Sequence, residues 1–256
     1  MTPPEALRVD AVTVRYANGH TALRDATFAL PANSIAALVG MNGAGKSTLF
    51  KALTGSVPLA AGRIAILGDP VARALRRGVV SYVPQAEEVD WTFPVLVEDV
   101  VMMGRYGQMN ALRWPRASDR AAVTEALERV GLAHLRHRQI GELSGGQRKR
   151  VFLARALAQE GRVILLDEPF AGVDMQTEET LIDLLRQMRD TGCTILVATH
   201  DLAALPRFCD RAVLVRGTVL AHGPTAQVFV RANLEATFGG QLPPAMTDQD
   251  RLLAAQ

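Results

Sequence analysis

Gly40-Met41-Asn42-Gly43-Ala44-Gly45-Lys46-Ser47-Thr48 is the stretch that decides how the rest of this sequence is interpreted. It follows the apolar run 35–39 and precedes a segment in which Leu49, Phe50 and Leu53 have helical spacing. The order is therefore strand, glycine loop, helix. The spacing of Gly, four residues and Gly-Lys-Ser is that of a phosphate-binding loop, whose backbone N–H groups point at phosphate oxygens. The positive end of the following helix adds to the attraction, so we predict that this loop binds a nucleoside triphosphate.

One side chain of the loop is predicted to bind phosphate and another to bind the metal ion. Lys46 is placed to reach the β- and γ-phosphates, and the Ser47 hydroxyl is placed to bind Mg²⁺. The other loop residues that we expect to contact the nucleotide are Gly40, Asn42, Gly43, Gly45 and Thr48. A glycine-rich turn with a solvated lysine is the alternative interpretation, and the flanking strand and helix patterns argue against it.

The composition of the 256-residue chain is that of an ordinary globular protein. A formal net charge of +2, from 28 basic and 26 acidic residues, does not point to nucleic acid. Apolar runs are shorter than the ~18 residues that cross a bilayer. Residues 1–5 lack the pattern of a secretory signal, so we expect a cytoplasmic protein. The spacing of Cys193 and Cys209 predicts neither a disulfide nor a zinc site.

The N-terminal part of the chain has the pattern of paired strands. Residues 7–16 and 22–30 alternate in hydrophobicity on either side of the turn Asn18-Gly19, which predicts an antiparallel pair. Tyr16 ends the first strand, where its ring could stack on a nucleotide base. A surface tyrosine at a strand end is an equally good interpretation when Tyr16 is taken by itself.

Two further strands are predicted over 62–67 and 79–83. The second runs into Pro84-Gln85, where the chain must leave the sheet because proline cannot donate to a β-ladder. Gln85 therefore lies at the end of a strand, on the side where open α/β sheets bind ligands. Taken alone, a loop glutamine is usually solvated.

The pattern becomes helical from residue 95 to about 158. Ser118 is the predicted N-cap of a helix that ends at Gly131. The loop 107–115 before this helix, with Arg105 beside it, carries basic and aromatic residues that match no nucleic-acid motif. We expect these residues to be solvated or to face a protein partner.

A second glycine turn precedes a helix at Leu143-Ser144-Gly145-Gly146-Gln147. Its backbone N–H groups and the Ser144 hydroxyl form another anion site at a helix N-terminus. A phosphate-binding loop followed by Leu-Ser-Gly-Gly-Gln resembles the ATP-binding cassette (ABC) ATPases.

The buried strand predicted over 163–166 ends in an acidic pair, Asp167-Glu168. In a doubly wound sheet this end falls beside the phosphate-binding loop. Asp167 would hold Mg²⁺ through water, and Glu168 would orient or deprotonate the water that attacks the γ-phosphorus. A strand-to-helix turn with a capping acid is the alternative. Another buried strand, 194–198, ends near His200, which by itself would more often be structural.

The resemblance covers about residues 7–230 and extends to each of these motifs. By position, it implies the following roles: Tyr16 as the adenine-stacking aromatic, 40–48 as the Walker A loop, Gln85 as the glutamine that senses Mg²⁺ and the membrane partner, 144–147 as the signature, Asp167 as the Walker B aspartate, Glu168 as the catalytic carboxylate, Asp174 as the D-loop aspartate and His200 as the switch histidine. The implied catalytic set is Glu168, His200 and Gln85, and the implied Mg²⁺ set is Ser47, Gln85 and Asp167.

The fold that the resemblance implies is that of an α/β P-loop NTPase of the ABC ATPase type. It has a RecA-like core, an antiparallel β subdomain and an inserted α-helical subdomain. We expect residues 1–240 to be a single nucleotide-binding domain, with the helical subdomain and its signature at approximately 93–158 and a tail at 241–256.

The resemblance also implies partners. In this family the signature of one subunit closes on ATP held by the Walker A loop of another, so we expect a homodimer and a monomer that hydrolyses ATP poorly. Integral membrane permease subunits would hold the dimer at the inner face of the cell membrane. An extracytoplasmic metal-binding protein would deliver the cargo, and no nucleic acid is expected.

Two stretches look like the ATPase subunits of manganese, iron and zinc importers: 82–105 and 168–174. The sequence around Trp91 favours the manganese and iron branch, with a zinc importer as the alternative. Since the ion would cross through other chains, Glu87, Glu88 and Asp90 are expected near the surface that receives the permease and not as metal ligands.

Other ABC proteins are less consistent with this sequence. Those of DNA repair carry long coiled-coil or zinc-bearing insertions, and the segment between Lys46 and Ser144 has no heptad run or cysteine cluster. Ribosome-associated factors are tandem cassettes, whereas this chain has one. A non-catalytic scaffold is disfavoured because Glu168 and His200 are both present.

Overall fold

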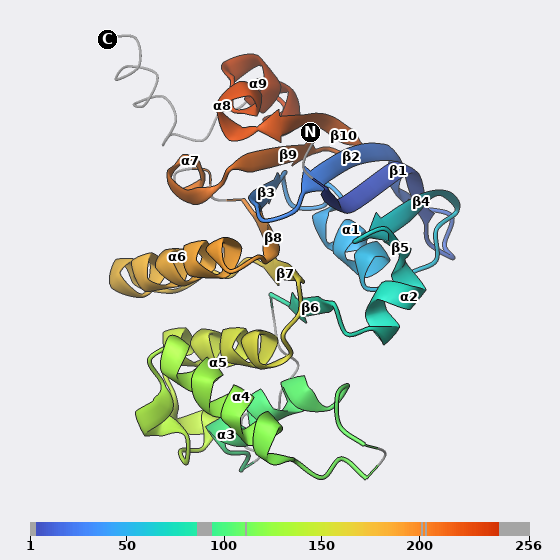
Figure 1. The fold of residues 1–256 in the computed structure, drawn as a ribbon. Coiled ribbons are helices and arrows are strands. Elements are labelled where there is room, and N and C mark those ends of the chain that lie inside the picture. The colour runs from blue at the N-terminus through green and yellow to red at the C-terminus, as the bar shows by residue number, and fades with distance from the viewer. Residues whose placement is uncertain (1–3, 86–93, 111, 201, 203, 241–256) are drawn as a thin grey trace.

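The computed structural model describes residues 4–85, 94–110, 112–200, 202 and 204–240. They form a six-stranded sheet, a four-stranded sheet and a separate group of helices (Figure 1). The predicted positions of Glu87, Glu88 and Asp90 lie outside the described residues.

The larger sheet has the strand order β10-β9-β3-β8-β7-β6. Its strands are β3 (Ile35–Val39), β6 (Val80–Val83), β7 (Val163–Asp167), β8 (Thr194–Thr199), β9 (Arg211–Val215) and β10 (Val219–Pro224). All neighbouring pairs are parallel except β9 with β10. The smaller sheet is antiparallel, in the order β2-β1-β4-β5. Its strands are β1 (Glu5–Arg15), β2 (Thr21–Pro31), β4 (Ala61–Ile66) and β5 (Asp69–Pro70).

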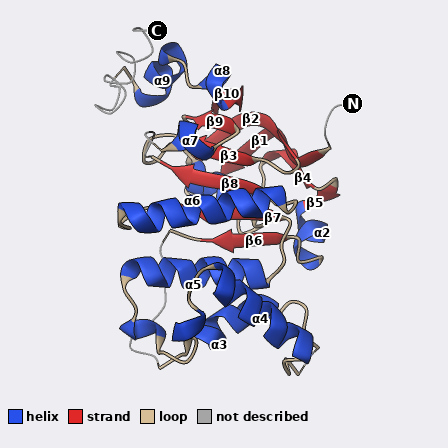
Figure 2. Cartoon of the chain, turned by 60° about the vertical axis from the view of Figure 1, so that its left-hand side comes forward, coloured by secondary structure: helices blue, strands red, loops and turns tan. Residues whose placement is uncertain are grey.

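The helices fall into two groups. Helices α1 (Lys46–Leu53), α2 (Val71–Arg76), α6 (Met175–Asp190), α7 (Leu205–Phe208), α8 (Thr225–Val228) and α9 (Arg231–Phe238) belong with the sheets. Helices α3 (Val97–Met102), α4 (Ala117–Arg129) and α5 (Gly145–Ala158) form a layer beyond β6, with the 3₁₀ turns η1 (Met103–Arg105), η2 (Ala133–Leu135) and η3 (Ile140–Glu142). Figure 2 shows α6 running alongside the larger sheet, with β6 between α6 and α5 in this view.

The alternation of side chains along the parallel strands gives the molecule two cores. In β3, Ile35, Ala37 and Val39 lie in one core, which also holds buried residues of α3, α4, α5 and α6. Ala36 and Leu38 point to the opposite face and pack with α1 and the smaller sheet. Every residue of β3 is buried, as expected of a central parallel strand that is covered on both faces.

The structure corrects the predicted start of α4. Ser118 lies inside the helix, and the N-cap is Arg116, whose backbone N–H donates to the carboxylate of Asp119 at 2.9 Å. A carboxylate at the third helical position that reaches back to the N-cap satisfies a donor that the helix leaves free. The acid therefore sets the start of the helix, and the serine does not.

The expectation that Arg105 is solvated or faces a partner is wrong. Its side chain is only 7 % exposed, and its Nε donates to Asp119 Oδ1 at 3.1 Å. Its Nη1 donates to the carbonyl of Ala158 at 2.8 Å and to Glu160 Oε2 at 2.9 Å. Arg105 thus joins η1, α4 and the end of α5. Along the loop that follows, Leu112 and Trp114 are exposed, as predicted.

Candidate active site

The carboxyl ends of the parallel strands bring the predicted motifs to one edge of the sheet. Val39, the last residue of β3, pairs with Thr199, the last residue of β8. Asp167, the last residue of β7, pairs with Ala198. The glycine loop, the acidic pair and His200 therefore leave the sheet side by side. Gln85 follows β6, the neighbour of β7.

Two glycines of the loop occupy positions where a side chain does not fit. A Cβ on Gly40 would lie 2.4 Å from the carbonyl oxygen of Val215. Gly45, the N-cap of α1, has a φ of 106°, and its Cβ would lie 2.9 Å from the carbonyl oxygen of Ala22. Glycine takes the conformation of Gly45 without strain, and the turn leaves the N–H groups at the start of α1 available to an anion.

Lys46 folds back over its own loop. Its Nζ donates to the carbonyl of Gly40 at 2.6 Å and approaches that of Met41 at 3.3 Å. Burial lowers the pKa of Lys46, and the negative charges of Glu168 and Asp167 oppose this shift. The ammonium group is thus buried beside two carboxylates, with backbone oxygens as its partners.

Asp167 and Ser47 provide the oxygen ligands of a candidate magnesium site. Burial raises the pKa of Asp167, and the neighbouring Glu168 raises it further. Lys46 and a hydrogen bond from the Ser47 side chain act in the opposite direction. Carboxylate and hydroxyl oxygens are the ligands that Mg²⁺ prefers. Since the structure places one of each in contact beside the glycine loop, these residues fit the ion.

Glu168 and His200 form a hydrogen-bonded pair. His200 Nδ1 lies 2.8 Å from Glu168 Oε1, and the Glu168 side chain is only 7 % exposed whereas that of His200 is 60 % exposed. Glu168 also has a φ of 52°, in the left-handed region that non-glycine residues seldom adopt. Backbone strain of this kind persists where surrounding contacts determine the conformation, and it is common in active sites.

A cavity of about 270 Å³ lies between the glycine loop and the acidic pair, and neither Gly40 nor His200 is among the residues that line it. Its lining consists of Tyr16, His20, Ala22, Met41, Asn42, Gly43, Gly45, Lys46, Ser47, Thr48, Gln85, Asp167 and Glu168. His20, Ala22 and Met41 were not predicted as site residues. No local pattern marks His20 and Ala22, because they reach the cavity through the pairing of β1 and β2.

Tyr16 lies next to the first turn of α1. Its hydroxyl lies 3.1 Å from the Thr48 hydroxyl, so the ring is held at the wall of the cavity and not free in solvent. This position is compatible with a ring that stacks on a base while the adjacent loop binds phosphates.

The signature residues lie at the N-terminus of α5 and do not line this cavity. Ser144 and Gln147 form a capping box: the Gln147 N–H donates to Ser144 Oγ at 3.2 Å, and the Ser144 N–H donates to Gln147 Oε1 at 2.9 Å. Ser144 and Gly145 are exposed. Asp174 has a similar capping role at α6, where it accepts from the Thr177 N–H at 2.9 Å.

A second cavity, of about 330 Å³, separates α5 from the strand ends. Val83, Gln85, Gly145, Lys149 and Phe152 are among its lining residues, together with the acidic pair. The cavity therefore lies between the signature helix α5 and the end of β7, and Glu168 is part of its wall. Lys149, two residues after Gln147, was not predicted as a site residue, since nothing in the sequence marks what it contacts.

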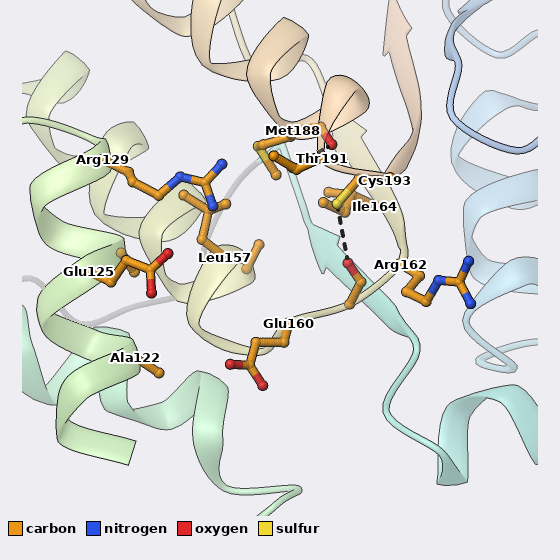
Figure 3. A pocket seen from close by; sticks show the side chains of 14 residues that line it. Ala122, Glu125, Arg129, Leu157, Glu160, Arg162, Ile164, Met188, Thr191 and Cys193 are labelled. Carbon is orange, nitrogen blue, oxygen red and sulfur yellow. Dashed lines mark hydrogen bonds between the residues drawn. The ribbon is translucent and has the colours of Figure 1, made fainter. Parts of the chain in front are cut away.

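A third cavity, of about 370 Å³, opens at the other end of β7 (Figure 3). Glu125 and Arg129 line one side, and Cys193 lies opposite them with its Sγ 3.7 Å from the Gly161 carbonyl. Burial raises the pKa of the Cys193 thiol. None of the predicted site residues lines this cavity, so it is separate from the candidate active site.

Comparison with protein-family models decides the class. Residues 23–171, more than half of the chain, match the model described as ABC transporter. The chain belongs to the ABC transporter family. The matched segment begins within β2 and ends just beyond Glu168, so it contains the glycine loop, the signature and the acidic pair, and nucleotide binding follows from membership.

Curated relatives of this ABC protein are named as parts of metal transport systems. It is 59 % identical over 236 residues to the chelated iron transport system membrane protein YfeB of Yersinia pestis, covering 92 % of this chain and 80 % of the relative. It is 58 % identical to the manganese transport system ATP-binding protein MntA of Synechocystis, covering 91 % and 90 %. The zinc transport system ATP-binding protein TroB of Treponema pallidum is 42 % identical, with 93 % and 88 % covered.

Solved structures confirm the predicted fold. An inward-facing structure described as a putative metal-chelate type ABC transporter matches with a TM-score of 0.81 and 29 % identity, over 92 % of this chain and 89 % of that one. The cbiO1 protein of Clostridium perfringens matches with a TM-score of 0.78 and 30 % identity, over 96 % and 99 %. Within the described residues, every helix is too short or too polar to span a bilayer.

Proposed function

We propose that this ABC protein is the ATP-hydrolysing subunit of an importer for a divalent transition metal, manganese or iron. The observation that carries the hydrolytic part is the meeting of the glycine loop, Asp167 and the Glu168–His200 pair at adjacent strand ends. The choice of metal is supported by the names of the relatives at 59 % and 58 % identity. A zinc importer is the alternative, supported by the relative at 42 % identity.

The glycine loop and Lys46 bind the triphosphate. Backbone N–H groups at the start of α1 donate to phosphate oxygens, and Lys46 exchanges its bonds to the carbonyls of Gly40 and Met41 for bonds to phosphate. Tyr16 stacks on the adenine. Ser47, Asp167 and Gln85 would hold Mg²⁺, which supplies positive charge against the phosphate oxygens when bound.

Glu168 acts on the attacking water. Its buried carboxylate orients the water and accepts its proton, while His200 holds Glu168 Oε1 in place and contacts the γ-phosphate. The ordering of this carboxylate by His200 and by the backbone fixes its position before the substrate binds.

A second copy completes the site. Residues 1–240 act as one nucleotide-binding domain, with the tail 241–256 outside it and the helical subdomain at about 93–158. The exposed N-terminus of α5, with the Ser144 hydroxyl and the N–H groups of Gly145 and Gly146, supplies the donors that close on the γ-phosphate in the other subunit.

The homodimer is held at the inner face of the cell membrane by integral membrane permease subunits. Gln85, at the end of β6 beside the helical layer, transmits the state of the site to the permease. An extracytoplasmic binding protein delivers the metal ion, which is the cargo and passes through the other chains. The similarity to a structure described as a putative metal-chelate type ABC transporter supports the assignment to a transporter.

The substitution Glu168→Gln tests the enzymatic part of the proposal. The amide cannot accept the proton of the attacking water, so we expect ATP to bind with near wild-type affinity while steady-state turnover falls by roughly 100-fold or more. Nucleotide affinity and phosphate release by the purified protein are the measurements. Turnover at the wild-type rate would contradict the role of Glu168.

The same variant tests the transport part in cells that lack this chain. Wild-type protein should restore uptake of radiolabelled Mn²⁺ or Fe²⁺, and the Glu168→Gln protein, present at an equal level, should not. Restoration of Zn²⁺ uptake alone would reject the manganese and iron assignment in favour of the zinc alternative. No effect on any of the three ions would reject metal import.

A further inference from the structure

Lys149 connects the signature helix to the backbone of the acidic pair. It lies in the first turns of α5, and its Nζ donates to the carbonyl oxygen of Glu168 at 3.3 Å and to that of Ala171 at a shorter distance. The side chain crosses the cavity of about 330 Å³ between α5 and the end of β7. Among the described residues, this contact joins the helical layer directly to the main chain of Glu168.

The backbone of Glu168 needs such support. Its φ of 52° is unfavourable for a residue with a side chain, and Pro169 restricts the conformation of the preceding residue further. The Glu168 N–H donates to the carbonyl of Ala198 at 2.9 Å, which fixes one side of the residue. On the other side, its carbonyl accepts from the Ala171 N–H at 3.2 Å and from Lys149.

The environment of Lys149 favours a fixed side chain. The residue is half-buried, and its charge is near the Glu168 carboxylate. Burial lowers the pKa of Lys149, and the negative charge of Glu168 acts against this shift. An ammonium group with two carbonyl partners and a nearby carboxylate is ordered at a position where a solvated lysine would not be.

We propose that Lys149 is a positioning residue for ATP hydrolysis, which holds the Glu168 backbone so that the carboxylate is directed at the attacking water. The inference rests on the proposed function, since it assumes that Glu168 acts on the water. Lys149 acts through the Glu168 backbone, with which it is in contact, and not on the reacting atoms.

The test compares Lys149→Met, which keeps the apolar stem and removes the charge, with Lys149→Arg, which restores a cationic donor. For Lys149→Met we expect kcat to fall by roughly 10-fold or more, while KM for ATP changes by less than about 2-fold, because the nucleotide contacts are intact. Lys149→Arg should recover most of kcat. Lys51→Ala, at an exposed position of α1, is the matched control and should leave both constants unchanged.

A double-mutant cycle separates positioning from a structural role. In the Glu168→Gln background, Lys149→Met should change the residual rate by less than about 2-fold, since the group that it positions is already disabled. The inference is overturned if Lys149→Met retains wild-type kcat, if the two substitutions have additive effects, or if KM rises in parallel with the loss of kcat. In each of these cases an inactive Glu168→Gln protein would leave the proposed function standing.

Discussion

At the scale of single residues, the candidate site buries ionisable side chains, and burial disfavours their charged forms. Asp167 is 6 % exposed and Lys46 is 7 % exposed, and burial shifts the pKa of each toward its neutral form. Among the described residues, the partners of these groups include the Gly40 carbonyl for Lys46 and the Ser47 hydroxyl for Asp167, and under the proposed function the nucleotide and its metal supply further interactions. We therefore expect these buried charges, which the proposed function requires, to lower the free energy of unfolding of the nucleotide-free protein.

Asp167→Asn should stabilise the nucleotide-free protein. A raised pKa means that the folded state disfavours the ionised carboxylate, so its destabilising effect is absent below the unfolded pKa of the group and is complete above its folded pKa. At pH 7 the substitution should raise Tm by roughly 2 °C or more, and the gain should shrink as the pH is lowered toward 4. Calorimetry at several pH values measures this. A lower Tm at pH 7 would show that the charge of Asp167 is stabilising.

At the scale of elements, Arg105 holds the helical layer together. Its guanidinium binds Asp119 of α4 and the Ala158 carbonyl at the end of α5, and both charged side chains of the Arg105–Asp119 pair are buried. The same carboxylate accepts the N-cap N–H of α4. One ion pair thus determines where α4 begins and how it meets η1 and α5, the helix that carries the signature.

Arg105→Ala should destabilise the protein by about 3–5 kcal/mol, because it leaves the Asp119 carboxylate buried and unpaired. Denaturant unfolding monitored by circular dichroism gives the free energy of unfolding. Arg63→Ala is the control, since Arg63 pairs with Asp10 but is 81 % exposed, and its removal should have little effect. Equal losses in the free energy of unfolding for the two substitutions would show that burial does not strengthen the contribution of the Arg105–Asp119 pair.

At the scale of the whole molecule, the signature does not line the nucleotide cavity of its own chain. The residues that line the 270 Å³ cavity come from the glycine loop and α1, from β2 and the turn before it, and from the ends of β6 and β7, whereas Gly145 at the exposed N-terminus of α5 lines only the neighbouring cavity. Since the signature residues Ser144, Gly146 and Gln147 line neither this cavity nor the neighbouring one, the proposed function has the signature contact the γ-phosphate of another copy. This is the geometric basis for expecting hydrolysis from dimers and not from monomers.

Ser144→Asp should prevent that dimer while leaving each subunit intact. Aspartate is as good an N-cap as serine, so α5 is retained, but its charge repels the triphosphate of the second copy. With ATP, the Glu168→Gln protein should elute as a dimer in size-exclusion chromatography with light scattering, and the Glu168→Gln/Ser144→Asp protein should elute as a monomer that still binds ATP. A stable dimer of the double variant would place the signature outside the nucleotide interface.

Local patterns in the sequence were sufficient for the elements that carry the chemistry. Apolar runs predicted β3, β7 and β8 nearly to the residue, and the glycine spacing predicted the loop and the start of α1. These features depend on short-range properties, namely buried strands without polar residues and turns that only glycine can make. Short elements with little periodicity, such as α2 and β5, were not predicted.

The sequence by itself determined the ligand class of the glycine loop and the acidic pair as a catalytic candidate, since both depend on residue types at fixed spacing, and its resemblance to the ABC ATPases added the class of the fold and the roles of Gln85 and His200. The tertiary structure alone decided which of these residues meet. It paired Glu168 with His200, brought His20 to the cavity, buried Arg105 and directed Lys149 to the Glu168 carbonyl. Such contacts join residues far apart in the chain, and their geometry follows from strand order and helix packing, which no local pattern encodes.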